Sequence, residues 1–159
     1  MIFFVRKIAV FACLLAVGSA QTAVETKHLR LTQSASVDTV RPGQRFSLAL
    51  EIELKPGMHV YAPSVEGYIP IDWSMAPNNT IVAHPVVTPP SKMLHLPAID
   101  ETLPVYGGKF RLTRDITVAK DAKLSGGVTI EGTFRYQACD DRMCYVPKTV
   151  PLKWTLNIQ

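Results

Sequence analysis

Strict alternation of apolar and other residues is the feature of this sequence that most restricts its fold. In residues 46–54 every second residue is apolar, and residues 128–136 and 150–158 repeat the pattern. A period of two is typical of a β-strand with one face in a core. Residues 110–118 give a fourth strand, and the shorter candidates are residues 28–32, 69–73 and 80–83. The sequence therefore predicts about seven strands.

Nothing in the sequence competes with this pattern, because no segment has a helical stripe over three turns. The chain of 159 residues contains 9 Gly and 12 Pro, which favour turns, and suffices for one domain. We predict an all-β fold, an immunoglobulin-like antiparallel β-sandwich, with a small barrel as the alternative. Pro151 indicates that the last strand starts at, or lies along, a sheet edge.

Residues 56–104 interrupt the regular alternation. Nine of the twelve prolines lie there, together with three of the four histidines. We interpret the segment as long irregular connections, which on a β scaffold often carry binding surfaces. Stiffening of loops and protection of sheet edges by proline are the alternative explanation.

The first twenty residues predict a cleaved export signal. Arg6 and Lys7 precede an apolar run of about ten residues, and Gly18, Ser19 and Ala20 supply small residues at a cleavage site before Gln21. The run is much shorter than the roughly 20 residues that cross a bilayer as a helix. We therefore expect a signal peptide at 1–20, a single domain at 21–159, a periplasmic location and no membrane insertion after cleavage. An uncleaved anchor and a lipid-modified Cys13 are the alternatives.

Cleavage would also change the charge and the cysteine count. The whole chain has 17 basic and 13 acidic residues, a formal net charge of +4, and removal of Arg6 and Lys7 leaves +2. The other basic residues are scattered, so we expect no nucleic-acid partner. Loss of Cys13 leaves two cysteines in an oxidising compartment.

Those two cysteines, Cys139 and Cys144, flank the turn of a predicted hairpin. One strand ends at Tyr136 and another begins soon after Pro147, so the cysteines are close enough to form a disulfide. A bridge that closes so short a loop stabilises a fold by only about 2 kcal/mol in the chain-entropy model. The spacing alone is compatible with a structural bridge and with a redox-active pair.

The residues between the cysteines bear on thiol chemistry. Asp140 and Asp141 oppose thiolate formation, and Arg142 offsets part of their charge. No helix begins here to lower a thiol pKa. We expect a thiol that is not strongly acidic and that needs a docked partner, as in a selective electron carrier.

Three segments resemble the N-terminal periplasmic domain of the bacterial thiol:disulfide interchange protein DsbD. Residues 136–152, which include the motif YQAC-x4-CYVP, are similar to the active-site hairpin of that family. Residues 55–61 are similar to its Gly-aromatic-x-x-Tyr strand, and residues 105–108 to its cap loop. The resemblance spans most of residues 28–158.

The resemblance implies an immunoglobulin-like domain that accepts electrons from a thioredoxin-like donor and passes them to periplasmic disulfide proteins, with cytochrome c biogenesis among the processes served. It assigns the mixed disulfide to Cys144 and its resolution to Cys139, without a metal or cofactor. Residues 103–107 correspond to a cap that shields the pair. The surrounding residues that we expect at the site are Tyr61, Val105, Tyr106, Gly107, Tyr136, Asp140, Asp141 and Tyr145.

The sequence departs from the family pattern in three respects. The C-x4-C spacing is one residue shorter than in the best-known member, and Val105 stands where that member has a capping phenylalanine. No counterpart of the family's membrane domain or of its thioredoxin-like domain follows, so we expect that a separate membrane electron conductor supplies the electrons.

Two other functions remain as alternatives. Met58, His59, Met93 and His95, with Met143 and the cysteines, are ligand types that suit Cu(I). The other alternative is a structural sandwich that serves for docking and in which the disulfide is only a staple.

Overall fold

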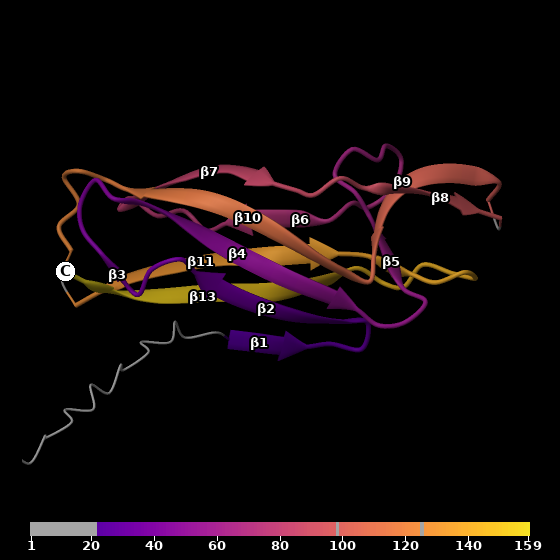
Figure 1. The fold of residues 1–159 in the computed structure, drawn as a ribbon, viewed down its shortest axis with the longest axis horizontal. Coiled ribbons are helices and arrows are strands. Elements are labelled where there is room, and N and C mark those ends of the chain that lie inside the picture. The colour runs from indigo at the N-terminus through magenta and orange to yellow at the C-terminus, as the bar shows by residue number, and fades with distance from the viewer. Residues whose placement is uncertain (1–21, 98, 125) are drawn as a thin grey trace, which may run out of the picture.

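The computed structural model describes residues 22–97, 99–124 and 126–159, which form strands and loops without a helix. The predicted signal at 1–20 lies outside these residues. The longer strands run along the long axis of the molecule (Figure 1). The strands are β1 (Thr22–Glu25), β2 (Leu29–Ala35), β3 (Thr39–Val40), β4 (Arg45–Leu54), β5 (His59–Tyr61), β6 (Asp72–Met75), β7 (Ile81–Val87), β8 (Lys92–Leu96), β9 (Glu101–Gly107), β10 (Lys109–Val118), β11 (Val128–Tyr136), β12 (Ala138–Cys139) and β13 (Lys148–Ile158).

Two sheets form the body of the molecule. One has the order β1-β2-β4-β10-β7 and the other β3-β13-β11-β6, and every pairing is antiparallel except that of β3 with β13. Buried apolar side chains of both sheets form one core between them. This arrangement confirms the prediction of an immunoglobulin-like sandwich, and the small barrel does not form.

Alternation explains which side chains enter this core. In β4, β11 and β13 every second side chain is buried, as the period of two predicts. In β10 every second side chain also points toward the core, although one of these inward positions, between Leu112 and Ile116, is occupied by Arg114. Its guanidinium donates hydrogen bonds to the carbonyl oxygens of Trp73 in β6 and His84 in β7, at 2.9 and 2.5 Å. Arg114 therefore joins the open edges of the two sheets.

The proline-rich segment is more regular than we predicted. Besides β6 and β7, which overlap the strands expected at 69–73 and 80–83, it contains β5, β8 and the first part of β9. Strands β5, β8 and β9 build a third sheet with β12, in the order β12-β5-β9-β8. The prolines are tolerated where pairing is incomplete. Pro85, for example, lies in edge strand β7 where the register with β10 shifts, and a bulge needs no ladder hydrogen bond from that residue.

The third sheet positions the candidate site. It lies at the end of the molecule that is opposite the C-terminus, next to the loop between β11 and β13 (Figure 1). Strand β5 pairs with β9 on one side and with β12 on the other. The segment that contains Tyr61 and the segment that contains Cys139 are therefore neighbours in one sheet, although 78 positions in sequence separate them.

Candidate functional site

The two cysteines form a disulfide at the base of the loop between β11 and β13. Their Cα atoms are 4.0 Å apart, and the residues form an isolated antiparallel bridge. Backbone hydrogen bonds from Tyr145 to Ala138 and from Asp140 to Met143 continue the hairpin on either side. The sequence prediction of a cysteine pair across this hairpin agrees with the geometry.

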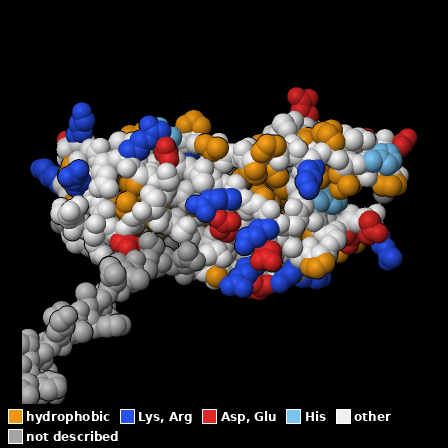
Figure 2. All heavy atoms as spheres, in the orientation of Figure 1, with side chains coloured by type: hydrophobic (Ala, Val, Ile, Leu, Met, Phe, Trp, Pro, Cys, Tyr) orange, Lys and Arg blue, Asp and Glu red, His pale blue; other side chains and the backbone are white. Residues whose placement is uncertain are grey.

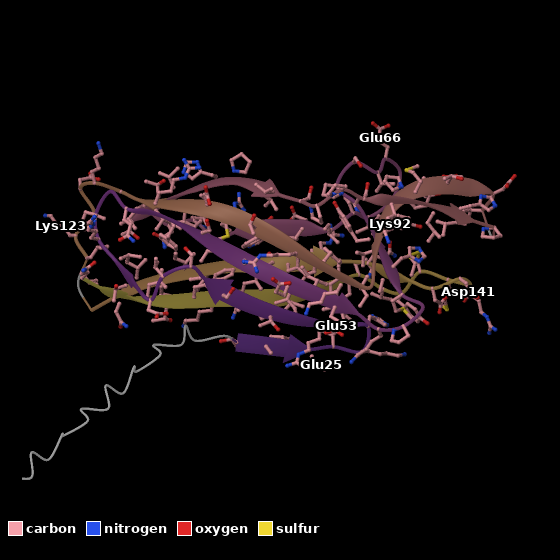
Figure 3. All side chains as sticks on the ribbon, in the orientation of Figure 1. Glu25, Glu53, Glu66, Lys92, Lys123 and Asp141 are labelled. Atoms are coloured by element: carbon pink, nitrogen blue, oxygen red, sulfur yellow. A yellow bond between two sulfur atoms is a disulfide. The ribbon has the colours of Figure 1, made fainter. Side chains whose placement is uncertain are left out.

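Asp140 organises the turn inside the disulfide ring. Its carboxylate accepts hydrogen bonds from the backbone amides of Arg142 and Met143, both at 2.8 Å, and from the Tyr145 hydroxyl at 2.6 Å. The Tyr145 bond, followed by the two backbone bonds, lowers the pKa of Asp140 to about 2. A fixed negative charge therefore lies beside the sulfurs, whereas Asp141 extends at the tip of the loop (Figure 3).

The two cysteines differ sharply in exposure. Cys139 lies on β12 and is only 1% exposed, whereas Cys144 is exposed on the far side of the loop. The Tyr61 hydroxyl lies 3.7 Å from the Cys144 sulfur. Burial raises the pKa of Tyr61, so this hydroxyl stays protonated and is able to donate to a Cys144 thiolate. Cys144 is thus the more accessible of the two cysteines.

Successive side chains of the third sheet point alternately to its two faces. Val60, Tyr106 and Ala138 are paired neighbours on β5, β9 and β12, and they enter the main core. The residues next to them turn to the other face, where Tyr61, Val105 and Cys139 pack in a second cluster with Val65. The sheet therefore separates the disulfide from the body of the sandwich.

The predicted cap residues fall on both faces. Val105 is buried against the disulfide cluster, and residues 103–107 belong to strand β9. Tyr106 turns away, because it stacks on Phe110 with ring centroids 4.7 Å apart and its hydroxyl donates to the carbonyl oxygen of Pro89. Gly107 pairs directly with His59.

The other two predicted tyrosines also differ in position. Tyr145 is half-buried, bonds to Asp140 and lies 4.5 Å from the ring centroid of His28. Tyr136 is fully buried in the main core, where its hydroxyl is 2.9 Å from the Thr26 hydroxyl oxygen. Tyr136 thus ends the strand that leads to the cysteine loop, while Tyr145 shapes the loop itself.

A cavity of about 340 Å³ lies between the cysteine loop and the hairpin of β8 and β9. Both cysteines, His59 and Tyr61 line one side, and Leu94, His95, Leu96, Pro97 and Ile99 line the other. Figure 2 shows a notch at this end of the molecule, with histidine and hydrophobic side chains on its upper rim. Leu94, Ile99 and Met143 are exposed apolar residues of this cavity.

Sequence reasoning missed the β8–β9 hairpin and the role of His59 as a neighbour of the disulfide. His59 is 7% exposed and lies two residues before Tyr61 on the same strand. The period of two would have placed His59 and Tyr61 on one face, so a signal was present for His59. For the β8–β9 hairpin there was little signal, because β8 is exposed along most of its length.

The structure brings the predicted copper ligands only partly together. His59, His95, Met143 and both cysteines line the cavity, whereas Met58 packs against the main core and Met93 is 64% exposed. Within residues 22–97, 99–124 and 126–159, no group of three or more His, Cys, Asp or Glu side chains is placed to hold a metal ion. The same part of the chain has no helix long and apolar enough to cross a membrane.

Two solved structures are similar to this fold. One is the N-terminal periplasmic domain of ScsB from Proteus mirabilis, with a TM-score of 0.60 and 18% identity over 87% of this chain. The match covers 52% of the ScsB chain, so the present chain spans about half its length. The other is the reduced N-terminal domain of DsbD from Neisseria meningitidis, with a TM-score of 0.52, 13% identity and coverage of 79% of this chain and 83% of that one. At these identities the likeness concerns the fold alone.

The sequence itself identifies the family. No curated protein matches significantly. However, the family model described as thiol:disulfide interchange protein DsbD, N-terminal, matches residues 26–153, which is most of the chain. The hairpin with its cysteine pair and the strand with Tyr61 both lie within this match. The chain therefore belongs to the family of DsbD N-terminal domains.

Proposed function

We propose that this protein is a periplasmic thiol–disulfide exchange domain that transfers electrons through Cys139 and Cys144. The observation that carries the proposal is the disulfide of a DsbD N-terminal family member in which Cys144 is exposed and Cys139 is buried. The donor is a thioredoxin-like domain, and the acceptors are periplasmic disulfide proteins. Residues 1–20 act as the export signal of a single domain at 21–159.

The unequal exposure of the two cysteines supports a separate step for each. A donor thiolate attacks the sulfur of the exposed Cys144, which forms a mixed disulfide and releases Cys139 as a thiolate. The second donor thiol then attacks the donor sulfur of that mixed disulfide. This step releases Cys144 and leaves the donor oxidised and the domain as a dithiol. The same steps in reverse, with a substrate disulfide, reoxidise the domain and give a substrate dithiol.

The surroundings of the pair favour exchange within a docked complex. Asp140 holds a negative charge next to the sulfurs, so the free thiol gains little activation from the loop. A partner that covers the cavity contacts the exposed apolar residues Leu94, Ile99 and Met143 and removes water from the sulfurs. Binding to this rim thus selects the partner before exchange begins.

A trapping experiment tests the proposal. In Cys139→Ser, the exposed Cys144 is left without its resolving partner. It should form a conjugate, cleavable by dithiothreitol, with a thioredoxin-like protein whose single cysteine is present as a mixed disulfide with thionitrobenzoate, which leaves as the thiolate. The matched control is Cys144→Ser, whose remaining sulfur is buried and should give no conjugate. Equal trapping of both variants, or of neither, contradicts the proposal.

The reduction potential separates exchange from a structural staple. Exchanging dithiols have potentials of about −180 to −270 mV, and structural disulfides lie below about −300 mV. We expect the Cys139–Cys144 pair in the first range when it is equilibrated against glutathione or dithiothreitol buffers. A value in the second range would identify the bridge as a staple.

A further inference from the structure

His59 is a buried polar side chain with an unexplained free nitrogen. The residue is 7% exposed, and its Nε2 atom is buried without a hydrogen-bond partner among the described residues. Burial of such a group without a partner is unfavourable, because the group loses its hydrogen bonds to water. A buried polar atom of this kind calls for an explanation in the chemistry of its surroundings.

The register of the third sheet directs His59 toward the resolving cysteine. His59 pairs with Cys139 across β5 and β12, and directly opposed residues of an antiparallel pair project to the same face with Cβ atoms about 4.5–5.5 Å apart. On its other side His59 pairs with Gly107, which has no side chain to cover the ring. Both His59 and Cys139 line the cavity.

Cys139 needs such a neighbour when it resolves a mixed disulfide. As a thiol it must lose a proton before it attacks, and its burial in the loop disfavours the thiolate. The charged and titratable groups on this cavity are Asp140, Asp141 and Arg142 from the cysteine loop, His95 from β8 and Tyr61 from β5. Asp140 and Asp141 oppose the thiolate, and Arg142 is exposed at the tip of the loop. His59 is the buried base that faces the thiol.

We propose that His59 accepts the proton of the Cys139 thiol in the step that resolves the mixed disulfide on Cys144, a role that rests on the proposed function. A disulfide bond forms between the sulfurs of Cys139 and Cys144, the disulfide bond between Cys144 and the substrate breaks, and the substrate leaves as a thiolate. The proton passes to His59 and then to the leaving thiolate or to water in the cavity. In the reverse direction His59 returns a proton to the Cys139 thiolate.

Burial makes His59 suitable as a base at neutral pH. It lowers the pKa of His59 below 6.5, and the nearby Asp140 opposes this shift in part. The imidazole is therefore neutral at pH 7 and has a lone pair available. Its protonated form, once it carries the Cys139 proton, is a strong enough acid to release that proton again.

The test is the reaction of the reduced protein with DTNB, an aromatic disulfide that needs no biological partner. Attack by Cys144 releases the first thionitrobenzoate, and attack by Cys139 on the mixed disulfide releases the second. In His59→Phe, which keeps a ring, we expect an unchanged first phase and a second phase slowed about 100-fold at pH 7, the lower end of general-base effects. His59→Gln, which keeps a polar group but cannot take the proton, should be equally slow, and it decides the question if His59→Phe fails to fold.

The pH dependence distinguishes proton transfer from packing. In the wild type, the rate constant of the second phase should change little with pH above the pKa of His59 and should decrease below that pKa. In both variants the rate constant should rise tenfold per pH unit up to the pKa of the Cys139 thiol. The control His84→Gln, in which the altered ring is 2.9 Å from the Thr117 hydroxyl on β10, should match the wild type. A second phase within about threefold of the wild type, with the same pH profile, would overturn the role of His59. Because DTNB replaces the partner, this result is independent of the trapping result with thioredoxin-like proteins.

Discussion

Asp140 is the residue on which the shape of the cysteine loop most depends. It is the common acceptor for two backbone amides of the turn and for the Tyr145 hydroxyl. The Tyr145 ring in turn lies against the ring of His28, the residue before β2, so the carboxylate links the loop to the body of the sandwich. The charge that disfavours a thiolate at this site is thus also the charge that holds the turn.

Asp140→Asn should therefore destabilise the loop in a pH-dependent way. The pKa of Asp140 is lowered from 3.8 to about 2 in the folded protein, so its stabilising effect is present above pH 4 and is lost as the pH falls toward 2. In urea unfolding, the wild-type midpoint should exceed that of Asp140→Asn at pH 6, and the two should converge near pH 2. Asp141→Asn, in the same loop, should match the wild type at both values. A difference that persists at pH 2 would show that the charge is not the cause.

At the scale of the elements, the close contact between β6 and β11 depends on one glycine. Gly132 occupies an inward position of β11 and pairs with Met75. A Cβ atom at this position would lie 2.6 Å from the carbonyl oxygen of Ser74 and 3.3 Å from the sulfur of Met75. The two strands approach each other closely because no side chain separates them.

Gly132→Ala should consequently force β6 away from β11 and lower the free energy of unfolding by about 1–3 kcal/mol, as overpacking typically does. The control is Gly107→Ala, where a Cβ atom would meet only the carbonyl oxygen of Met58 at 3.9 Å. Urea unfolding of the two variants measures the difference. An equal stability of both would mean that the sheet relaxes without cost at Gly132.

Strands with one buried face could be predicted from the sequence, and strands at the site could not. The alternation of apolar residues was sufficient to predict β4, β11 and β13, because the core requires an apolar side chain at every second position. Strand β8 is exposed along most of its length, and β5 is buried at all three positions, so neither shows a period of two.

The candidate site could be predicted only in part, because some of its features depend on local spacing and others on the pairing of distant strands. The spacing of Cys139 and Cys144 across a turn is local, so the hairpin could be predicted from the sequence. Whether Val105 or Tyr106 faces the disulfide depends on the pairing of β9 with β5, which links distant segments. Such pairing is not encoded in local spacing, and the pairing of His59 with Cys139 could not be predicted from the sequence for this reason.

At the scale of the whole molecule, the site and the core have different sources of stability. The long pairings of β4 with β10 and of β11 with β13 enclose the main core. The third sheet consists of shorter strands around a small cluster at one end (Figure 1). Regions with few buried apolar contacts open more readily than the core. We therefore expect the end of the molecule that carries the disulfide to rearrange without unfolding the sandwich.

Reduction of the disulfide should therefore loosen the site end and leave the sandwich intact. The bridge closes a loop of about six residues, which contributes only about 2 kcal/mol in the chain-entropy model. In hydrogen exchange, dithiothreitol should speed the amides of residues 137–147 and of β8 and β9, while those of β4, β10 and β11 keep their protection. Cys139→Ala/Cys144→Ala, which has no bridge, should show no response to dithiothreitol. If reduction instead exposed the amides of β4 and β10, the bridge would be a staple for the whole fold, and a role in exchange would be hard to reconcile with that dependence.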